Sequence, residues 1–162
     1  MSSKIRVLLV DDEEELTTYL MRRLSMRGFR VTGTTSGEEA LAVARERDFD
    51  VAVVDLRMPE MDGEEVTRRL MQVQPMLQVV VLTGHASIES ALECGAGGVF
   101  RYLSKPHDFD ALVKVLKDAT AVRRGLLRER YEAEMEEVLK QEGISPQVLL
   151  ARWRALQKKY NQ

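Results

Sequence analysis

The sequence predicts an α/β fold: a doubly wound, five-stranded parallel sheet with helices on both faces. Short apolar, β-branched runs alternate with amphipathic helical segments along residues 5–121, and this alternation is typical of right-handed βαβ crossovers. Polar residues follow these runs where the strands are expected to end. Such placement is typical of a parallel sheet that binds ligands at the carboxyl ends of its strands.

The first half of this pattern begins with residues 5–10 (IRVLLV), an almost continuously apolar run that is typical of a strand buried on both faces. Leucines at helical spacing predict a helix over residues 13–27, and a second strand is expected at 29–34. Ser36 is the predicted N-cap of the next helix, and Glu39 is placed to complete a capping box.

The second half contains three further apolar runs with strand character, at residues 51–54, 78–82 and 99–103. The helices expected after them lie over residues 64–73, over residues 86–94 and from Asp108 onward. Together these elements predict one domain over residues 1–121.

Residues 122–162 are expected to form a helical tail. A loose apolar stripe extends the last helix of the domain, and Gly143 is expected to end it. Ser145 and Pro146 are typical of the N-cap and first residue of a short final helix. The apolar face of that helix is predicted to contain Leu149, Trp153, Leu156 and Tyr160.

The composition fits a protein with a hydrophobic core and no strong overall charge. Hydrophobic residues make up 44% of the 162 residues, and the formal net charge is −2, so overall charge does not favour binding to nucleic acid or membranes. Residues 1–121 carry 15 Lys+Arg and 20 Asp+Glu, whereas the tail carries 9 and 6. Cys94 is the single cysteine, which with the absence of a signal-peptide pattern predicts a cytoplasmic protein.

Five polar residues are predicted to meet at one edge of the sheet. Asp11 and Asp12 follow the first strand, Asp55 ends the third, Thr83 follows the fourth and Lys105 follows the fifth. Three carboxylates in one place require a proton or a cation, and Mg²⁺ prefers such oxygen ligands. With Lys105 and Thr83, the cation would hold phosphoryl oxygens while the central Asp55 attacks as nucleophile.

Four motifs at these strand ends, VDDEEE, VVDLRMPEMDG, VVLTGHA and YLSKP, resemble the receiver domain of two-component response regulators. The resemblance covers residues 5 to about 121. It implies a flavodoxin-like sheet with strand order 2-1-3-4-5. It also implies that Asp55 is the phosphoacceptor and that Mg²⁺ is held by Asp11, Asp12, Asp55 and the backbone carbonyl of Arg57, with Asp12 as a direct ligand.

The resemblance also implies roles for residues around the acceptor. Thr83 and Lys105 would bind the phosphoryl group. Thr83 and Tyr102 would form the switch, which repacks the face made by the fourth helix, the fifth strand and the fifth helix. Pro59 and Gly63 would shape the loop after the acceptor.

Two positions that vary within the family bear on the lifetime of the acyl phosphate. They are Arg57, two residues after the acceptor, and His85, two residues after Thr83. We expect their side chains to set the rate at which water attacks the phosphoryl group.

The expected partners are a sensor histidine kinase or histidine phosphotransfer protein and an output protein that the sequence does not identify. Self-association through the switch face or the tail is a further expectation. The protein would not be an enzyme beyond its own phosphorylation and dephosphorylation.

The sequence leaves two alternative functions open. The stretch EEVLKQEGISPQVLLARW faintly resembles a helix–turn–helix, which would make the chain a DNA-binding regulator. Three features argue against DNA binding: the tail is short, it lacks a clustered cationic face, and Leu149 and Trp153 are expected to be buried. The other alternative is an enzyme of similar fold, such as a phosphatase with an aspartate nucleophile. Such a phosphatase typically has a second aspartate two residues after the first, and Arg57 at that position argues against it.

Overall fold

The computed structural model describes residues 3–84, 99–105 and 108–160. The helix expected over residues 86–94, and with it Cys94, lies outside the described residues, as does His85. The chain divides into two compact units, Met1–Ala121 and Val122–Gln162.

The first unit contains a five-stranded sheet whose strands all pair in parallel. The strands are β1 (Arg6–Val10), β2 (Arg30–Thr34), β3 (Val51–Val54), β4 (Gln78–Thr83) and β5 (Val99–Ser104). Their spatial order is β2-β1-β3-β4-β5, which confirms the predicted order. Each strand lies within one or two residues of its predicted bounds.

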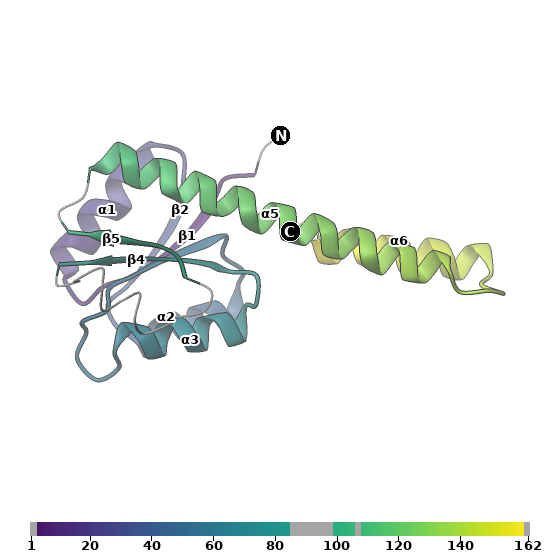
Figure 1. Ribbon diagram of the computed structural model, residues 1–162, viewed down its shortest axis with the longest axis horizontal. Helices are drawn as coiled ribbons and strands as arrows, with labels where there is room; N and C mark the ends of the chain where they lie inside the picture. The colour runs from purple at the N-terminus through teal and green to yellow at the C-terminus, as the bar shows by residue number, and fades with distance from the viewer. Residues whose placement is uncertain (1–2, 85–98, 106–107, 161–162) are drawn as a thin grey trace. The chain divides into compact units, whose positions relative to one another are not determined.

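Helices cover both faces of this sheet, as predicted (Figure 1). The described helices are α1 (Glu14–Met26), α2 (Gly37–Glu46), α3 (Gly63–Val73), α5 (Phe109–Leu139) and α6 (Pro146–Tyr160). In the first unit, α1 and the beginning of α5 lie on one face, and α2 and α3 lie on the other.

The alternation of side chains along the strands creates two separate cores. In β1, Val7 and Leu9 point to the α1 and α5 side, whereas Leu8 and Val10 point to the α2 and α3 side. All four side chains are buried. Because Val7–Val10 are buried on both faces of the sheet, all four are apolar, and the run IRVLLV is almost continuously apolar rather than alternating.

Side-chain caps fix the start of several helices. The Ser36 Oγ accepts a hydrogen bond from the Glu39 N–H at 3.2 Å, which confirms Ser36 as the N-cap of α2. The Glu39 carboxylate accepts from the N–H of Thr35, one residue before the N-cap. The predicted box therefore closes one residue earlier than its standard form.

The strand ends are level where the site is expected. Val10 pairs with Val54, and Val54 pairs with Val81. The residues directly after β1 and β3, Asp11 and Asp55, therefore lie at the same edge of the sheet. The Asp55 N–H donates to the carbonyl of Val10 at 2.9 Å, which fixes this relationship.

The second unit is a helical hairpin formed by the C-terminal part of α5 and by α6. The Glu134 carboxylate of α5 accepts hydrogen bonds from the Lys159 ammonium at 2.9 Å and from the Tyr160 hydroxyl at 2.5 Å. The rings of Tyr131 and Tyr160 meet edge to face with centroids 5.9 Å apart. Ser145 caps α6, because its Oγ accepts from the Val148 N–H at 3.4 Å.

One prediction about the tail is wrong. Trp153 was expected to be buried, but its exposed fraction is 38%, and Leu149 is half-buried. The cause is geometric: two paired helices cover only the stripe where they touch, so neighbouring apolar side chains stay in solvent. Among the described residues, no helix is both long enough and apolar enough to cross a membrane.

Candidate functional site

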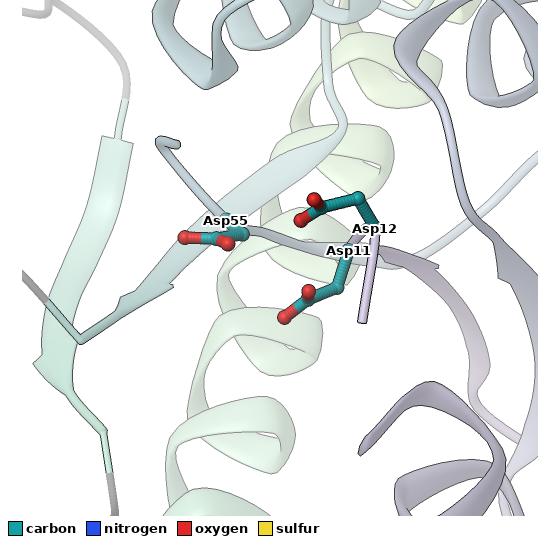
Figure 2. Close-up of side chains that lie close together, drawn as sticks. All are labelled: Asp11, Asp12 and Asp55. Carbon is teal, nitrogen blue, oxygen red and sulfur yellow. The ribbon is translucent and has the colours of Figure 1, made fainter. Parts of the chain in front are cut away.

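Three carboxylates converge at the carboxyl edge of the sheet. Asp11 and Asp55 are buried, with exposed fractions of 8% and 6%, whereas Asp12 is exposed. One oxygen from each of the three side chains lies within 4.8 Å of the others. Figure 2 shows them extending from two neighbouring strand ends, Asp11 and Asp12 after β1 and Asp55 after β3. The predicted grouping of these side chains is therefore present.

Lys105 joins this group from the end of β5. Its ammonium nitrogen lies 2.6 Å from Asp11 Oδ2 and 3.4 Å from Asp55 Oδ2. The lysine side chain is 15% exposed. A cation in this position compensates part of the repulsion between the buried carboxylates.

Glu13 is a fourth carboxylate at the site that the sequence did not single out. Its Oε1 lies 3.3 Å from the Lys105 nitrogen. The only signal for it is its place as the third acidic residue of the run VDDEEE. An exposed acid in such a run has no feature that distinguishes it from a solvated surface residue.

The environment shifts two pKa values at the site. Burial raises the pKa of Asp11 above its usual value, and the hydrogen bond from Lys105 offsets this only in part. Burial alone would lower the pKa of Lys105, but its contacts with Asp11, Asp55 and Glu13 together raise it. Lys105 therefore stays cationic, while the ionised form of Asp11 is held at a cost that a bound cation would reduce.

Asp11 is also held in place by its own chain. Its Oδ1 accepts a hydrogen bond from the Glu13 N–H at 2.9 Å, and its backbone carbonyl accepts one from the Thr17 hydroxyl at 3.2 Å. One carboxylate oxygen is thus committed to the turn before α1, and the other faces Lys105. This fixes the orientation of the carboxylate relative to Asp55.

The loop after Asp55 returns tightly to β3. The Gly63 N–H donates to the Leu56 carbonyl at 2.8 Å. A Cβ at position 63 would lie 2.1 Å from the Asp55 carbonyl oxygen and 2.5 Å from Leu56 Cα. Backbone atoms cannot yield at this distance, so glycine is required for the start of α3 to approach the acceptor strand.

The middle of this loop carries backbone strain. Glu60 has a φ of 70°, which an L-residue other than glycine adopts at a cost. The Met61 N–H donates to the carbonyl of Pro59 across it at 2.9 Å. The Arg57 N–H donates to Asp55 Oδ1 at 3.4 Å, and the Arg57 side chain is exposed.

Of the other predicted site residues, Thr83 and Tyr102 lie in the described strands β4 and β5. Thr83 ends β4 and pairs with Ser104 in β5, whereas its side chain and the whole of His85 are outside the description. Tyr102 is half-buried in β5 and packs against the core on the α2 and α3 side. At Gly84, a Cβ would meet Lys105 side-chain carbons at 3.9 Å, so this residue, directly after β4, lies beside the lysine.

The residues present fit a magnesium ion. All three grouped side chains offer carboxylate oxygens, and Mg²⁺ is bound in proteins by a few such oxygens together with water. Two of the carboxylates are buried and therefore need positive charge nearby. Asp12 is exposed and keeps the group open to solvent, which suits an ion that retains part of its hydration.

Comparisons with known proteins agree with this geometry. The transcriptional regulatory protein GlrR of Escherichia coli K12 is 42% identical over 113 residues, which cover 70% of this chain and 26% of GlrR. A crystal structure of adenylate cyclase from Rhodopirellula baltica is similar, with a TM-score of 0.72 and 35% identity over 86% of this chain and 99% of that chain. The response regulator TrrA from Thermotoga maritima was solved with Mg²⁺ and BeF. It matches with a TM-score of 0.64 and 28% identity, over 71% of this chain and 98% of that one.

The chain spans about a quarter of the length of the curated relatives it matches. The similarity to them therefore concerns one region of larger proteins. The family model of the response regulator receiver domain matches residues 7–117, which include Asp11, Asp12, Asp55 and Lys105. The chain belongs to the response regulator receiver domain family.

Proposed function

We propose that this chain is a receiver that is switched by transfer of a phosphoryl group to Asp55. The observation that carries the proposal is the position of the Lys105 ammonium, 2.6 Å from Asp11 and 3.4 Å from Asp55. This arrangement places the lysine cation beside the acceptor oxygen. The grouped carboxylates remain able to bind a second cation. Together the two cations supply the positive charge that a transferred phosphoryl group requires.

Asp55 is the residue of this group best placed to act as nucleophile. It follows β3, the central strand, and is almost fully buried. Its Oδ2 is near Lys105 and its Oδ1 accepts from the Arg57 N–H. The carboxylate is thus oriented by contacts on both oxygens, which lowers the entropic cost of in-line attack.

The proposed step is a simple displacement. An Asp55 carboxylate oxygen attacks phosphorus, and a new P–O bond forms while the P–N bond of a donor phosphohistidine breaks. The electron pair leaves on the imidazole nitrogen, which takes up a proton. Lys105 and the Thr83 hydroxyl would contact the phosphoryl oxygens as charge shifts toward them. A histidine kinase or a histidine phosphotransfer protein is the proposed donor.

Asp11, Asp12, Asp55 and the backbone carbonyl of Arg57 are the proposed holders of Mg²⁺. The ion would supply positive charge that neutralises the phosphoryl oxygens and the acceptor carboxylate. Asp11 contributes a buried carboxylate fixed by the Glu13 N–H. Asp12 contributes an exposed carboxylate.

The output would be a change in protein contacts. Thr83 and Tyr102 are the proposed switch residues, and Arg57 and His85 the proposed determinants of phosphoryl lifetime. Tyr102 is half-buried in β5, so rotation of its ring inward or outward would change its exposure. The helical tail from residue 122 is proposed as the element that passes this change to a partner or to a second copy.

The names of the curated relatives raise the alternative of transcriptional regulation. Only about a quarter of those proteins corresponds to this chain. The tail places its basic and apolar residues along one hairpin, which does not favour a separate recognition helix. We therefore propose a protein partner rather than DNA, in a cytoplasmic setting that suits the family and the single Cys94.

The proposal is tested by labelling with phosphoramidate, a small donor with a P–N bond. We expect intact-mass measurements to show one added phosphoryl group with Mg²⁺, and none with a chelator or in Asp55→Asn. Asp48→Asn is the matched control, because Asp48 is exposed and outside the site. Absence of labelling in the wild-type protein, or equal labelling of Asp55→Asn, would contradict the proposal.

A further inference from the structure

The ammonium group of Lys105 has no spare donor in this structure. It offers three N–H donors, and three carboxylates lie within hydrogen-bond distance. The distances are 2.6 Å to Asp11, 3.3 Å to Glu13 and 3.4 Å to Asp55. In the proposed function a phosphoryl oxygen on Asp55 must also contact this ammonium. One of the three partners therefore has to leave.

Glu13 is the partner that can leave at least cost. Its side chain is 63% exposed, compared with 11% for Asp11 and 7% for Asp55. Water can solvate the Glu13 carboxylate once it is released, whereas Asp11 and Asp55 are shielded from water and would need a bound cation in place of the ammonium. The contact between Glu13 and Lys105 is accordingly the exchangeable one.

A second observation concerns the position of Glu13 in the chain. It is the N-cap residue of α1, where Ser, Thr, Asp and Asn are preferred. Ser36 and Asp62 cap α2 and α3 through their side chains. Among the residues that the structure describes, Glu13 makes no such cap bond. Its carboxylate extends to Lys105 instead.

We propose that Glu13 is a positioning residue that holds Lys105 in the unphosphorylated protein and must release it before Asp55 accepts a phosphoryl group. This inference rests on the proposed function. Glu13 thereby slows phosphorylation and gives up the stability that a good N-cap would provide to α1. The residue acts through Lys105 and does not contact the phosphoryl group itself.

Two substitutions separate the contact from the charge. Glu13→Gln removes the charge and weakens the contact. Glu13→Asp keeps the charge, but a shorter carboxylate at an N-cap turns toward the N–H groups of α1 and away from Lys105. The matched control is Glu14→Gln, which removes an exposed charge in the first turn of α1. No contact between Glu14 and Lys105 is present in the described residues.

The measurement is the rate of labelling by phosphoramidate, at a Mg²⁺ concentration raised until the rate no longer changes. We expect Glu13→Gln and Glu13→Asp both to be labelled about two- to fivefold faster than the wild-type protein and Glu14→Gln, as expected for one exposed ion pair. Glu13→Asp should in addition have a higher thermal midpoint. A purely structural role of Glu13 would not couple a faster rate to a more stable protein.

Coupling to Lys105 is tested in a second background. If Glu13 acts through the lysine, Glu13→Gln should leave the residual rate of Lys105→Ala unchanged. Wild-type rates in both Glu13 variants, or an equal acceleration in the Lys105→Ala background, would overturn the inference while labelling itself remains intact. Failure to label any of the proteins would instead contradict the proposed function, and the inference with it.

Discussion

The ammonium nitrogen of Lys105 lies 2.6 Å from Asp11 Oδ2, although 94 residues separate the two in the chain. Lys105 follows β5 and Asp11 follows β1, and two strands, β3 and β4, lie between these in the sheet. The contact thus spans the carboxyl edge of the sheet and passes the end of β3, where Asp55 sits. A change in charge at Asp55 therefore alters the electrostatic environment of residues that follow three different strands.

Magnesium is expected to stabilise the folded protein. A ligand that binds only the folded state adds about 1.4 kcal/mol to the free energy of unfolding at ten times its Kd. This gain, measured by thermal denaturation with and without Mg²⁺, should be largely lost in Asp12→Asn. Asp12 is exposed, so the replacement itself should cost little stability. A full Mg²⁺ response in Asp12→Asn, or a reduced one in Asp48→Asn, would contradict the proposed ion site.

The raised pKa of Asp11 predicts a pH-dependent stability difference. Well below the ordinary value of 3.8 the carboxyl is protonated in both states. The cost of burying it grows as the pH rises from 3.8, where the unfolded chain ionises, to the raised pKa of the folded state, and is constant above that. Asp11→Asn should therefore be more stable than the wild-type protein at neutral pH without Mg²⁺, and the two should converge as the pH falls toward 3.8. Denaturant titrations across this range check the trend. A less stable variant at neutral pH would mean that the ion pair with Lys105 outweighs burial.

Gly63→Ala should disturb both stability and the site. The new Cβ would lie 2.1 Å from the Asp55 carbonyl oxygen, so α3 or the acceptor loop must shift, at a cost of about 1–3 kcal/mol. The free energy of unfolding, measured by denaturant titration, and the rate of phosphoramidate labelling should both fall. The control is Gly125→Ala, where the new Cβ would meet no described atom within 4 Å apart from its chain neighbours and the nearby backbone of its own helix. This change in a helix should stabilise by about 0.5–1 kcal/mol, and equal effects at the two positions would refute the close-approach argument.

The tail hairpin should depend on the charge of Glu134. Hydrogen bonds from Tyr160 and Lys159 lower the pKa of Glu134 below its usual 4.5. The stabilisation is therefore complete above that value and is lost as the pH falls through the lowered pKa. At neutral pH, amide hydrogen exchange in α6 should be about two- to fivefold faster in Glu134→Gln. Glu137→Gln, an exposed change in α5, should leave the exchange unaltered, and equal exchange in the two variants would contradict the contact.

The sheet was predictable because its three inner strands, β1, β3 and β4, are buried on both faces. The buried positions of such strands are apolar on both faces. A run such as VAVV at residues 51–54, with turn residues after it, therefore predicts a buried strand. Placing Asp11 and Asp55 at one edge then follows from the parallel topology alone. The sequence therefore predicted the three carboxylates as a group before any distance was known.

The contacts that exposed side chains make could not be predicted from the sequence. Glu13 reaches Lys105 because the turn before α1 places it there, and no local pattern marks that choice. Trp153 has the spacing of a buried face, but helical spacing says nothing of how much of that face a single partner helix covers. The positive φ of Glu60 lies in the loop closed by the Gly63–Leu56 hydrogen bond, and a glutamate gives no local signal for it.

Phosphorylation of Asp55 is tested most directly by locating the phosphoryl group on the chain. Borohydride reduces an acyl phosphate to an alcohol, so the labelled protein can be reduced, digested and sequenced by tandem mass spectrometry. We expect a single reduced carboxyl, at residue 55, formed only when Mg²⁺ is present during labelling. A reduced carboxyl at Asp11, Asp12 or Glu13, or none at all, would contradict it.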